Sequence, residues 1–323
     1  MAQSVGGGGG VRGVKDRAIE GAPLATQFSL GAGNAGSSGA NGSGSTVNVE
    51  NSGVSRTSGY NAFGIFAQSV GGGGGLSLTT ISNNLMAIAD SRVGAQSGTG
   101  GNGGDVNVVQ TGSVITSGAG SVGIVAQSVG GGGGDLGVVS KDQSASIAGG
   151  SNVTMGGVSS AIGNGGNVTV TNNSEIRTSG ANSVGILAQS VGGGGGVIMM
   201  SGAGTISPTW ALGKGNGGSV TVNVNSPIYT TGAGAYGVIA ESVGGGGGLA
   251  ISGTTVTDSG GFGSGQGGLV TVNVLAPIYA SGAGAIAVYG HSLGANADPI
   301  VTVAPGQTVT ATSGASAVVL DGP

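Results

Sequence analysis

Residues 168–196 read VTVTNNSEIRTSGANSVGILAQSVGGGGG, and close copies of this stretch recur along the 323-residue chain. Self-similarity at intervals of tens of residues is the signature of repeat architectures, so the fold has to be interpreted repeat by repeat. The closing block of the stretch, AQSVGGGGG or AESVGGGGG, recurs before a diverged copy, GHSLGANA; these copies begin at Ala2, Ala67, Ala126, Ala188, Ala240 and Gly290.

Part of each repeat has a fixed length. It opens with a Val-x-Val pair, and the first Val of the pair always lies 23 residues before the Val or Leu of the closing block. A β-branched residue (Val54, Val114, Ile176, Ile228, Ile278), a turn Gly (Gly59, Gly118, Gly180, Gly232, Gly282) and an aliphatic residue (Ile65, Ile124, Ile186, Val238, Val288) follow in order. This spacing predicts a single repeat array over 1–323 with cores at about 47–70, 106–129, 168–191, 220–243, 270–293 and 301–323, the last one incomplete.

The rest of each repeat varies in length. From the closing block to the next core the gaps are 42, 36, 39, 29, 27 and then 8 residues, which predicts Gly-rich excursions hung on a stacked scaffold. The apolar residues after each glycine run predict further strands, either a third side or a side sheet, and Asn84–Ser91 is a weaker helix candidate. We expect the five-glycine runs to stack as a face without side chains; the alternative is a wide, mobile corner.

The cores alternate apolar and polar residues with a period of two, as in Val220–Val224, and Gly, Ser, Asn and Pro separate these stretches. This pattern predicts an all-β fold, a parallel β-helix or β-solenoid in which equivalent residues form ladders. One ladder would join Val47, Val106, Val168, Val220, Val270 and Val301, a second Ala67, Ala126, Ala188 and Ala240, and a third Gln68, Gln127, Gln189, Glu241 and His291, with amides bonded from repeat to repeat. A flexible Gly-rich linker is the alternative, but a linker would not preserve a 23-residue offset.

The composition excludes several classes of protein. The chain has 79 Gly, no Cys, one His, 6% charged residues and a net charge of −4. It therefore lacks the basic excess of a nucleic-acid-binding protein, and without strict Gly-X-Y periodicity it is not collagen. No apolar run is long enough for a membrane-spanning helix, and most metal and catalytic-triad chemistry lacks its usual ligand or base.

Several fragments imitate chemical motifs. Thr257–Gly261 (TDSGG) resembles a serine-protease nucleophile segment, but the single histidine, His291, follows it at the Gln position of the repeat. Gly261–Gly265 lacks the strand-loop-helix context and the Lys-Ser/Thr of a phosphate loop. Gly100–Asp105 loosely matches a calcium-binding repeat, but the position of Asp105 is occupied by Asn167, Ser219 and Leu269 in later repeats, which argues against a calcium array. The carboxylates form no recurring pair (Glu50, Asp105, Asp142, Glu175, Glu241, Asp258), and the aromatic residues are predicted to pack rather than to form a sugar-binding strip (Trp210, Tyr60, Tyr229, Tyr236, Tyr279, Tyr289). We therefore predict no catalytic, cofactor-binding or metal-binding residues.

The repeats resemble the passenger repeats of large Gly-rich autotransporter (type V secreted) adhesins of Gram-negative bacteria. The resemblance rests on Ile115-Thr-Ser-Gly118 and Gly123-Ile-Val-Ala-Gln-Ser-Val-Gly130, with copies in other repeats, and covers nearly the whole chain. It implies a β-solenoid exported through an outer-membrane barrel, with a role in adhesion, aggregation or biofilm structure at the cell surface or outside the cell. Met1 lies directly on a repeat, without the signal peptide and barrel of that family, so we expect a segment of a longer passenger.

These observations favour a non-catalytic extracellular structural or adhesive segment. Its expected partners are further copies, end to end or side by side, and a surface or glycan ligand; nucleic acid binding and membrane insertion of this segment are not expected. One alternative is a polysaccharide-binding or polysaccharide-cleaving β-helix protein. Another is an ice-binding solenoid that uses a threonine column, although the first two copies carry Asn48 and Asn107 there (Thr169, Thr221, Thr271, Thr302).

Overall fold

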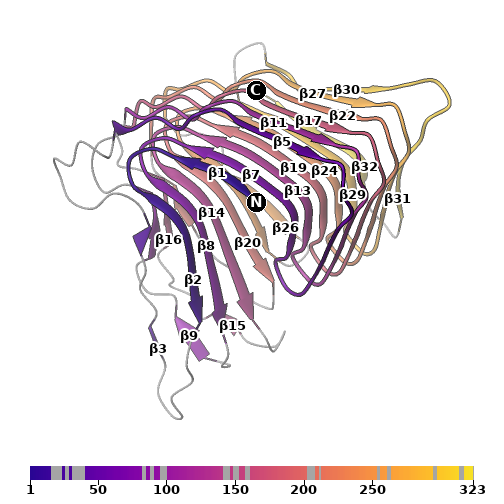
Figure 1. Ribbon diagram of the computed structural model, residues 1–323, viewed down its shortest axis with the longest axis horizontal. Coiled ribbons are helices and arrows are strands. Elements are labelled where there is room, and N and C mark those ends of the chain that lie inside the picture. The colour runs from indigo at the N-terminus through magenta and orange to yellow at the C-terminus, as the bar shows by residue number, and fades with distance from the viewer. Residues whose placement is uncertain are drawn as a thin grey trace.

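The structure is a computed structural model in which strands lie side by side, one per repeat (Figure 1). It describes residues 1–15, 24–25, 29–30, 41–81, 85–87, 91–94, 100–140, 146–147, 153–156, 161–201, 208–210, 212–252, 255–259, 263–293, 297–312 and 316–322. Within these ranges the chain is all-β and has no α-helix. The strands are arranged in parallel sheets, and the one antiparallel pair among the described strands joins β25 to β26.

Three sheets are formed by the repeat cores. Sheet E contains β5 (Val47–Asn51), β11 (Val106–Gln110), β17 (Val168–Asn172), β22 (Val220–Val224), β27 (Val270–Val274) and β30 (Ile300–Val303). Sheet F contains β6 (Ser55–Ser58), β12 (Val114–Ser117), β18 (Ile176–Ser179), β23 (Ile228–Thr231), β28 (Ile278–Ser281) and β31 (Val309–Thr312). Sheet A contains β1 (Ala2–Val5), β7 (Phe63–Val70), β13 (Val122–Val129), β19 (Val184–Val191), β24 (Tyr236–Val243), β29 (Ile286–Ser292) and β32 (Ser316–Asp321).

The excursions form the other sheets. Sheet B contains β2 (Gly9–Lys15), β8 (Gly74–Ile81), β14 (Gly133–Ser140), β20 (Gly195–Ser201), β25 (Gly247–Ser252) and β26 (Thr255–Ser259). Sheet D contains β4 (Ser29–Leu30), β10 (Ser91–Val93), β16 (Val153–Met155) and β21 (Pro208–Trp210), and sheet C contains β3 (Leu24–Ala25), β9 (Leu85–Ala87) and β15 (Ser146–Ile147). The helix expected over 84–91 is therefore wrong, because strand β9 occupies its centre and Ser91 begins β10.

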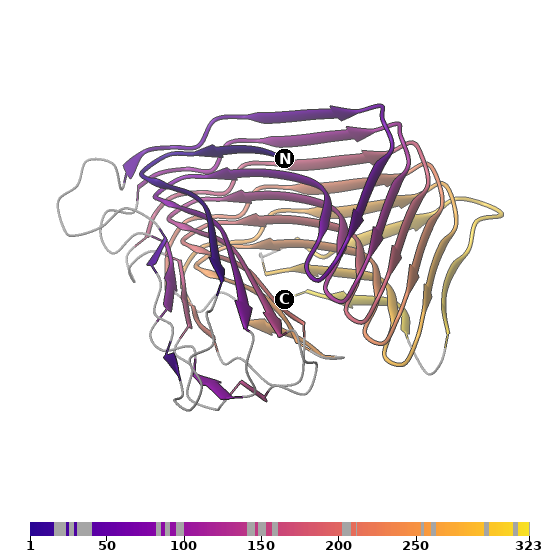
Figure 2. The ribbon, with the colours of Figure 1, turned by 60° about the horizontal axis from the view of Figure 1, so that its bottom comes forward.

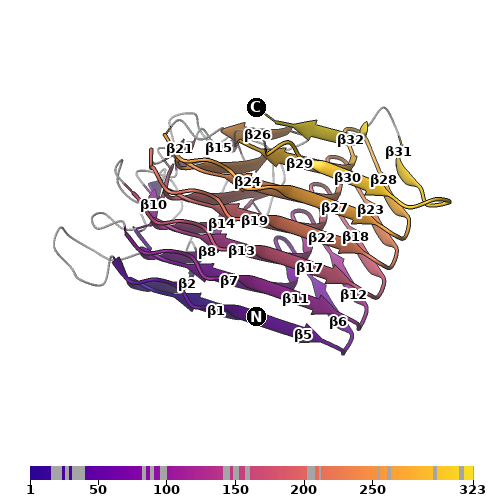
Figure 3. The ribbon, with the colours of Figure 1, turned by 90° about the horizontal axis from the view of Figure 1, so that it is seen from above.

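The repeats are stacked in sequence order, from indigo to yellow (Figure 3). Every pairing in sheets E, F and A is parallel and joins equivalent positions of adjacent repeats; Val106, for example, pairs with Val47 and Val168. Alternate residues of the strands in sheet E point inward. The inward valines, such as Val168 and Val170, are buried against alanines and isoleucines of sheets A and F. The ladders predicted for Val47–Val270 and for Ala67–Ala240 are confirmed.

The central strands of sheet A, β13, β19 and β24, are buried on both faces because the excursions add a second layer. The other face of sheet A packs on sheet B through residues such as Val125, Leu187 and Leu249, and sheet B in turn packs on sheet D around Met155 and Trp210. The strands of sheet B turn away from one end of the core strands and run beside them (Figure 2). The prediction of a side sheet is thus confirmed for the described strands of the excursions.

Two details of the predicted register are wrong. Val301 pairs with Val272, and Thr302 pairs with Asn273, so neither continues the column of Val270 and Thr271. The threonine column expected for an ice-binding face therefore stops at Thr271 among the described residues. In the first repeat, Ser55 rather than Val54 pairs with Val114, and Val54 is left 61% exposed, because the β-branched residue of this repeat lies seven rather than eight residues after the first core valine.

The glycine runs are ordered and stacked. Gly133 pairs with Gly74 and Gly195, and Gly134 pairs with Gly75 and Gly196. Their φ angles are 138° and 134°, in the region that favours glycine. A Cβ on Gly133 would lie 1.9 Å from the carbonyl oxygen of Gly195, so the backbones approach more closely than any side chain allows. The expectation of a stacked face without side chains is confirmed, and the mobile corner is not what the structure shows.

Candidate functional site

The serine of the closing block bonds two repeats together. Ser190 Oγ donates to the carbonyl oxygen of Gly166 in its own repeat (2.8 Å) and accepts from the backbone N–H of Gly218 in the next repeat (2.8 Å). Ser69, Ser128 and Ser242 make the same pair of bonds, at 2.7 to 2.9 Å. Each of these serines is fully buried, so both of its bonds form away from bulk water.

The Gly-Asn-Gly-Gly segments before each core provide a second set of bonds between repeats. Asn102 Oδ1 accepts from the backbone N–H of Asn164 (2.8 Å), and Asn164 Oδ1 accepts from the backbone N–H of Asn216 (2.8 Å). Asp105, the residue weighed as a calcium ligand, accepts in the same way from the backbone N–H of Asn167 (2.8 Å). The acidic side chain thus occupies a position where asparagine serves equally well.

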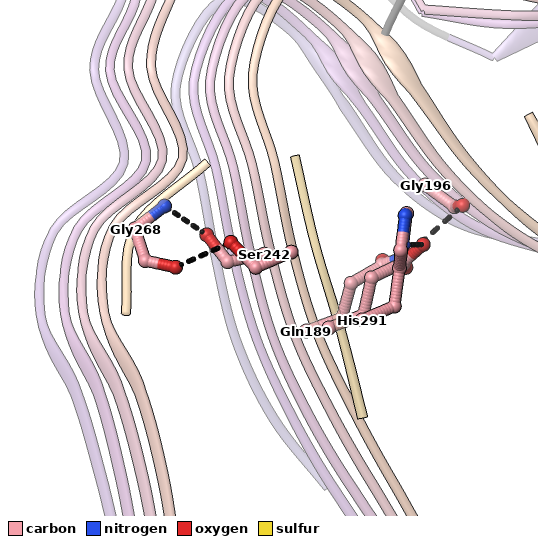
Figure 4. Close-up of polar contacts among 7 residues, drawn as sticks. Gln189, Gly196, Ser242, Gly268 and His291 are labelled. Carbon is pink, nitrogen blue, oxygen red and sulfur yellow. Dashed lines mark hydrogen bonds and ion pairs between the residues drawn. The ribbon is translucent and has the colours of Figure 1, made fainter. Parts of the chain in front are cut away.

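The predicted glutamine ladder is confirmed, and it lies between sheets A and B. Gln68 Nε2 donates to Gln127 Oε1 (2.6 Å), Gln127 Nε2 donates to Gln189 Oε1 (2.7 Å), and Gln189 Nε2 donates to Glu241 and to the carbonyl oxygen of Gly196. Figure 4 shows that Gln189 and His291 lie on one side of sheet A, whereas Ser242 points to the other side toward Gly268. The two faces of one strand therefore carry two separate polar columns.

Asp135 is a buried residue that sequence reasoning missed. Its side chain is fully buried on β14 and accepts from Gln127 Nε2 (2.8 Å) and Gln68 Nε2 (3.4 Å). Burial raises the pKa of the Asp135 carboxyl to about 7, and the hydrogen bond from Gln127 lowers it only in part. One signal in the sequence could have pointed to Asp135: the neighbouring repeats carry the apolar residues Leu76 and Val197 at the same position, with which Asp135 pairs.

His291 belongs to the same buried column. The residue is 1% exposed, and its Nδ1 lies 3.2 Å from Glu241 Oε1. An ionised carboxylate only accepts hydrogen bonds, so when Glu241 is ionised Nδ1 carries the proton in this pair. Asp258 and Ser259 of the protease-like fragment lie on β26, where Asp258 pairs with Leu249, and Gly260 and Gly261 lie outside the described residues.

The aromatic residues do not form one strip. Trp210, Tyr236 and Tyr289 are 8%, 2% and 7% exposed and pack between sheets. Tyr229 and Tyr279 share a column on the outer face of sheet F, with parallel rings 5.3 Å apart. The Arg177 guanidinium lies 4.4 Å from the centre of the Tyr229 ring, so both faces of that ring are covered.

The outer face of sheet F is hollowed beside this aromatic pair. The hollow has a volume of about 270 Å³ and lies over β12, β18 and β23. Its outward-facing lining consists of Ile115, Ser117, Arg177, Ser179, Tyr229 and Thr231. Arg177 is bonded to Glu175 through Nε–Oε1 (2.5 Å) and Nη2–Oε2 (2.9 Å), so the charged groups at its rim neutralise each other.

Within the described residues, no three His, Asp or Glu side chains gather as a metal site would require, and no helix has the length and apolarity to cross a bilayer. Comparison of the chain with protein-family models, curated proteins and solved structures found no match in any of the three. The function is therefore inferred from the residues themselves.

Proposed function

We propose that the chain is a parallel β-solenoid segment with a non-catalytic structural or adhesive role, at the surface of a Gram-negative bacterium or outside the cell. Parallel sheets with one strand per repeat support the solenoid. The resemblance of its repeats to autotransporter passengers supports the location. The expected roles are attachment, aggregation or biofilm filament formation.

The observation that carries this proposal is how the repeated polar side chains are used. The serine, asparagine and glutamine columns bond one repeat to the next, and three of their members, Ser190, Asn164 and Gln127, bridge adjacent repeats at 2.7 to 2.8 Å. Side chains that recur from repeat to repeat thus contribute to stacking, which a stiff display element requires. Ladders of this kind resist local unfolding because every opened repeat leaves bonding groups of both neighbours unpaired.

The placement of the carboxylates favours a structural role over polysaccharide cleavage. Glycoside hydrolysis uses two carboxyl groups that flank a substrate. Asp135 and Glu241 are fully buried between sheets, and Glu175 is held by Arg177. Buried or paired in this way, these three carboxyl groups support the proposal of binding over cleavage for the polysaccharide-related alternative.

Self-association is the partner interaction we expect for this segment. Flat sheet faces with few charges offer little repulsion between copies, and weak contacts are multiplied along a repeat. Nucleic acid and membrane insertion remain unexpected for this composition.

Surface display tests the proposal. The chain is placed on the outside of non-adherent bacterial cells through a passenger-exporting anchor, and cell settling and attachment are measured against the anchor alone. We expect faster settling or stronger attachment, together with concentration-dependent sedimentation of the purified chain. Cells that behave like the anchor control, with a purified chain that stays monomeric at every concentration, would contradict the proposal.

A further inference from the structure

The outer face of sheet F carries two parallel columns of side chains. The register places Arg56, Ile115, Arg177, Tyr229, Tyr279 and Thr310 in one column, and Ser58, Ser117, Ser179, Thr231, Ser281 and Thr312 in the other. The second column therefore carries a hydroxyl group in all six paired strands. Neighbouring strands are about 4.8 Å apart, so the hydroxyls recur at that interval along the stack.

The hollow lies between these two columns. Arg177 leans over the Tyr229 ring, toward the following repeat, and is held there by Glu175. The preceding repeat carries the shorter Ile115 in the same column, which leaves space above Ile115 and Ser117. The volume of about 270 Å³ falls just below the range for drug-sized ligands, so it suits one ring of a longer molecule.

The lining is largely apolar and also carries hydroxyl groups, and its one charged side chain, Arg177, is paired with Glu175. Ser179 and Thr231 are exposed and Ser117 is half-buried, and within the described residues their hydroxyls make no hydrogen bond to protein. They are therefore available as donors and acceptors. Arg177 forms an ion pair with Glu175, whose side chain is 38% exposed, so an anionic ligand would have to displace the Glu175 carboxylate from Arg177.

We propose that this hollow and the hydroxyl column beside it bind one unit of an extended, uncharged glycan that runs along the stack. The inference rests on the proposed adhesive function and names the ligand class and the site. Sugar hydroxyls pair with Ser117, Ser179 and Thr231, and an apolar sugar face covers Ile115. The length of a pyranose unit is similar to the strand spacing, so successive units meet successive hydroxyls. Both faces of Tyr229 are covered, so the sugar contacts the edge of this ring, and affinity for each unit is low.

Binding is measured by calorimetry or ligand-observed NMR, with the full chain and with cellohexaose, chitohexaose and maltohexaose as probes. We expect saturable binding of at least one probe, with a Kd on the order of 1 mM. The Ser179→Trp variant fills the hollow from an exposed strand position and should weaken binding at least about tenfold. The matched control, Thr221→Trp, places the same bulk at an outward strand position of sheet E in the neighbouring repeat and should bind like the wild type. Circular dichroism confirms that both variants keep the wild-type fold.

Three results would overturn the inference: no saturable binding of any neutral probe, equal binding by Ser179→Trp and the wild type, or tighter binding of polygalacturonate that is lost in Arg177→Gln. The last result would assign the face to acidic glycans. Displaying Ser179→Trp on cells separates this inference from the proposed function. If the wild type promotes attachment but binds no glycan, only the inference fails; if neither protein promotes attachment while the wild type binds a probe, the adhesive proposal fails.

Discussion

Two substitutions in one glycine column separate the two reasons why glycine is needed there. Gly10, Gly75, Gly134, Gly196 and Gly248 pair in register along sheet B. The φ angles of Gly10 and Gly134 are nearly identical, at 132° and 134°. A Cβ on Gly10 would meet nothing within 4 Å, whereas a Cβ on Gly134 would lie 2.1 Å from the carbonyl oxygen of Gly75. Gly10→Ala therefore tests backbone strain alone, and Gly134→Ala tests strain together with contact between strands.

The expected magnitudes follow from this geometry. A non-glycine residue in such a backbone region costs about 1–3 kcal/mol, and both variants bear that cost. In Gly134→Ala, β14 and β8 must also part by about 1 Å, because a Cβ atom does not approach an oxygen closer than 3.0 Å. This movement weakens bonds nearby such as Gly132 N–H to Gly71 O (2.8 Å) and Gly133 N–H to Gly73 O (3.1 Å). At about 1 kcal/mol for each lost bond, Gly134→Ala should lose at least about 2 kcal/mol more than Gly10→Ala.

Urea denaturation measures the difference. Trp210 is the single tryptophan and packs against sheet B, so its fluorescence reports the unfolding of this layer, and circular dichroism reports the whole stack. Equal losses of unfolding free energy in the two variants would refute the contact argument and leave backbone strain as the reason for the glycine runs. A smaller loss in Gly134→Ala would refute the stacking of the runs itself.

Three further outcomes are expected. Ser190→Ala should lower the free energy of unfolding by about 1–3 kcal/mol, because Gly166 O and Gly218 N–H both lose their hydrogen-bond partner. The control, Ser179→Ala on the exposed face, should change the free energy of unfolding by less than about 0.5 kcal/mol, and urea melts compare the two variants. Gln127→Leu should lower the free energy of unfolding by about 2–5 kcal/mol, since it leaves Gln68, Gln189 and Asp135 with broken hydrogen bonds inside the core. A variant as stable as the wild type in the same melts would mean that the glutamine ladder contributes no stability. The pKa of Asp135 is raised from 3.8 to about 7 in the folded state, so its contribution to stability is fully present below pH 3.8 and is lost as pH rises through 7, at up to about 1.4 kcal/mol per pH unit. Asp135→Asn should flatten this slope in melts at a series of pH values, and an unchanged slope would contradict the assignment.

The fixed offset within each core was enough to predict the stacking of equivalent residues from sequence. Period-two alternation identified the inward residues of sheet E, and the recurring glutamine predicted the amide ladder. The register of the last repeat was not predictable in this way, because its linking segment of 8 residues aligns equally well to two valines of β27. Asp135 was missed because one residue that breaks an apolar column has no repeat signal, and the hollow on sheet F was missed because it depends on how Arg177 leans.

The change from glutamine to glutamate to histidine in the buried column follows from the direction of its hydrogen bonds. Each glutamine donates from Nε2 to the side chain of the following repeat, from Gln3 through Gln189. An ionised carboxylate has no donor to pass on, so with Glu241 ionised the directional chain ends there, and Glu241 accepts from Gln189 on one side and from the Nδ1–H of His291 on the other. A Gln at position 241 would extend the amide chain and meet His291 with its own N–H, so the Glu241→Gln variant requires the other imidazole tautomer, with Nδ1 as the acceptor. Nitrogen chemical shifts of the His291 ring would therefore exchange their assignment between the two nitrogens in that variant, and an unchanged pattern would show that Glu241 does not set the direction of the column.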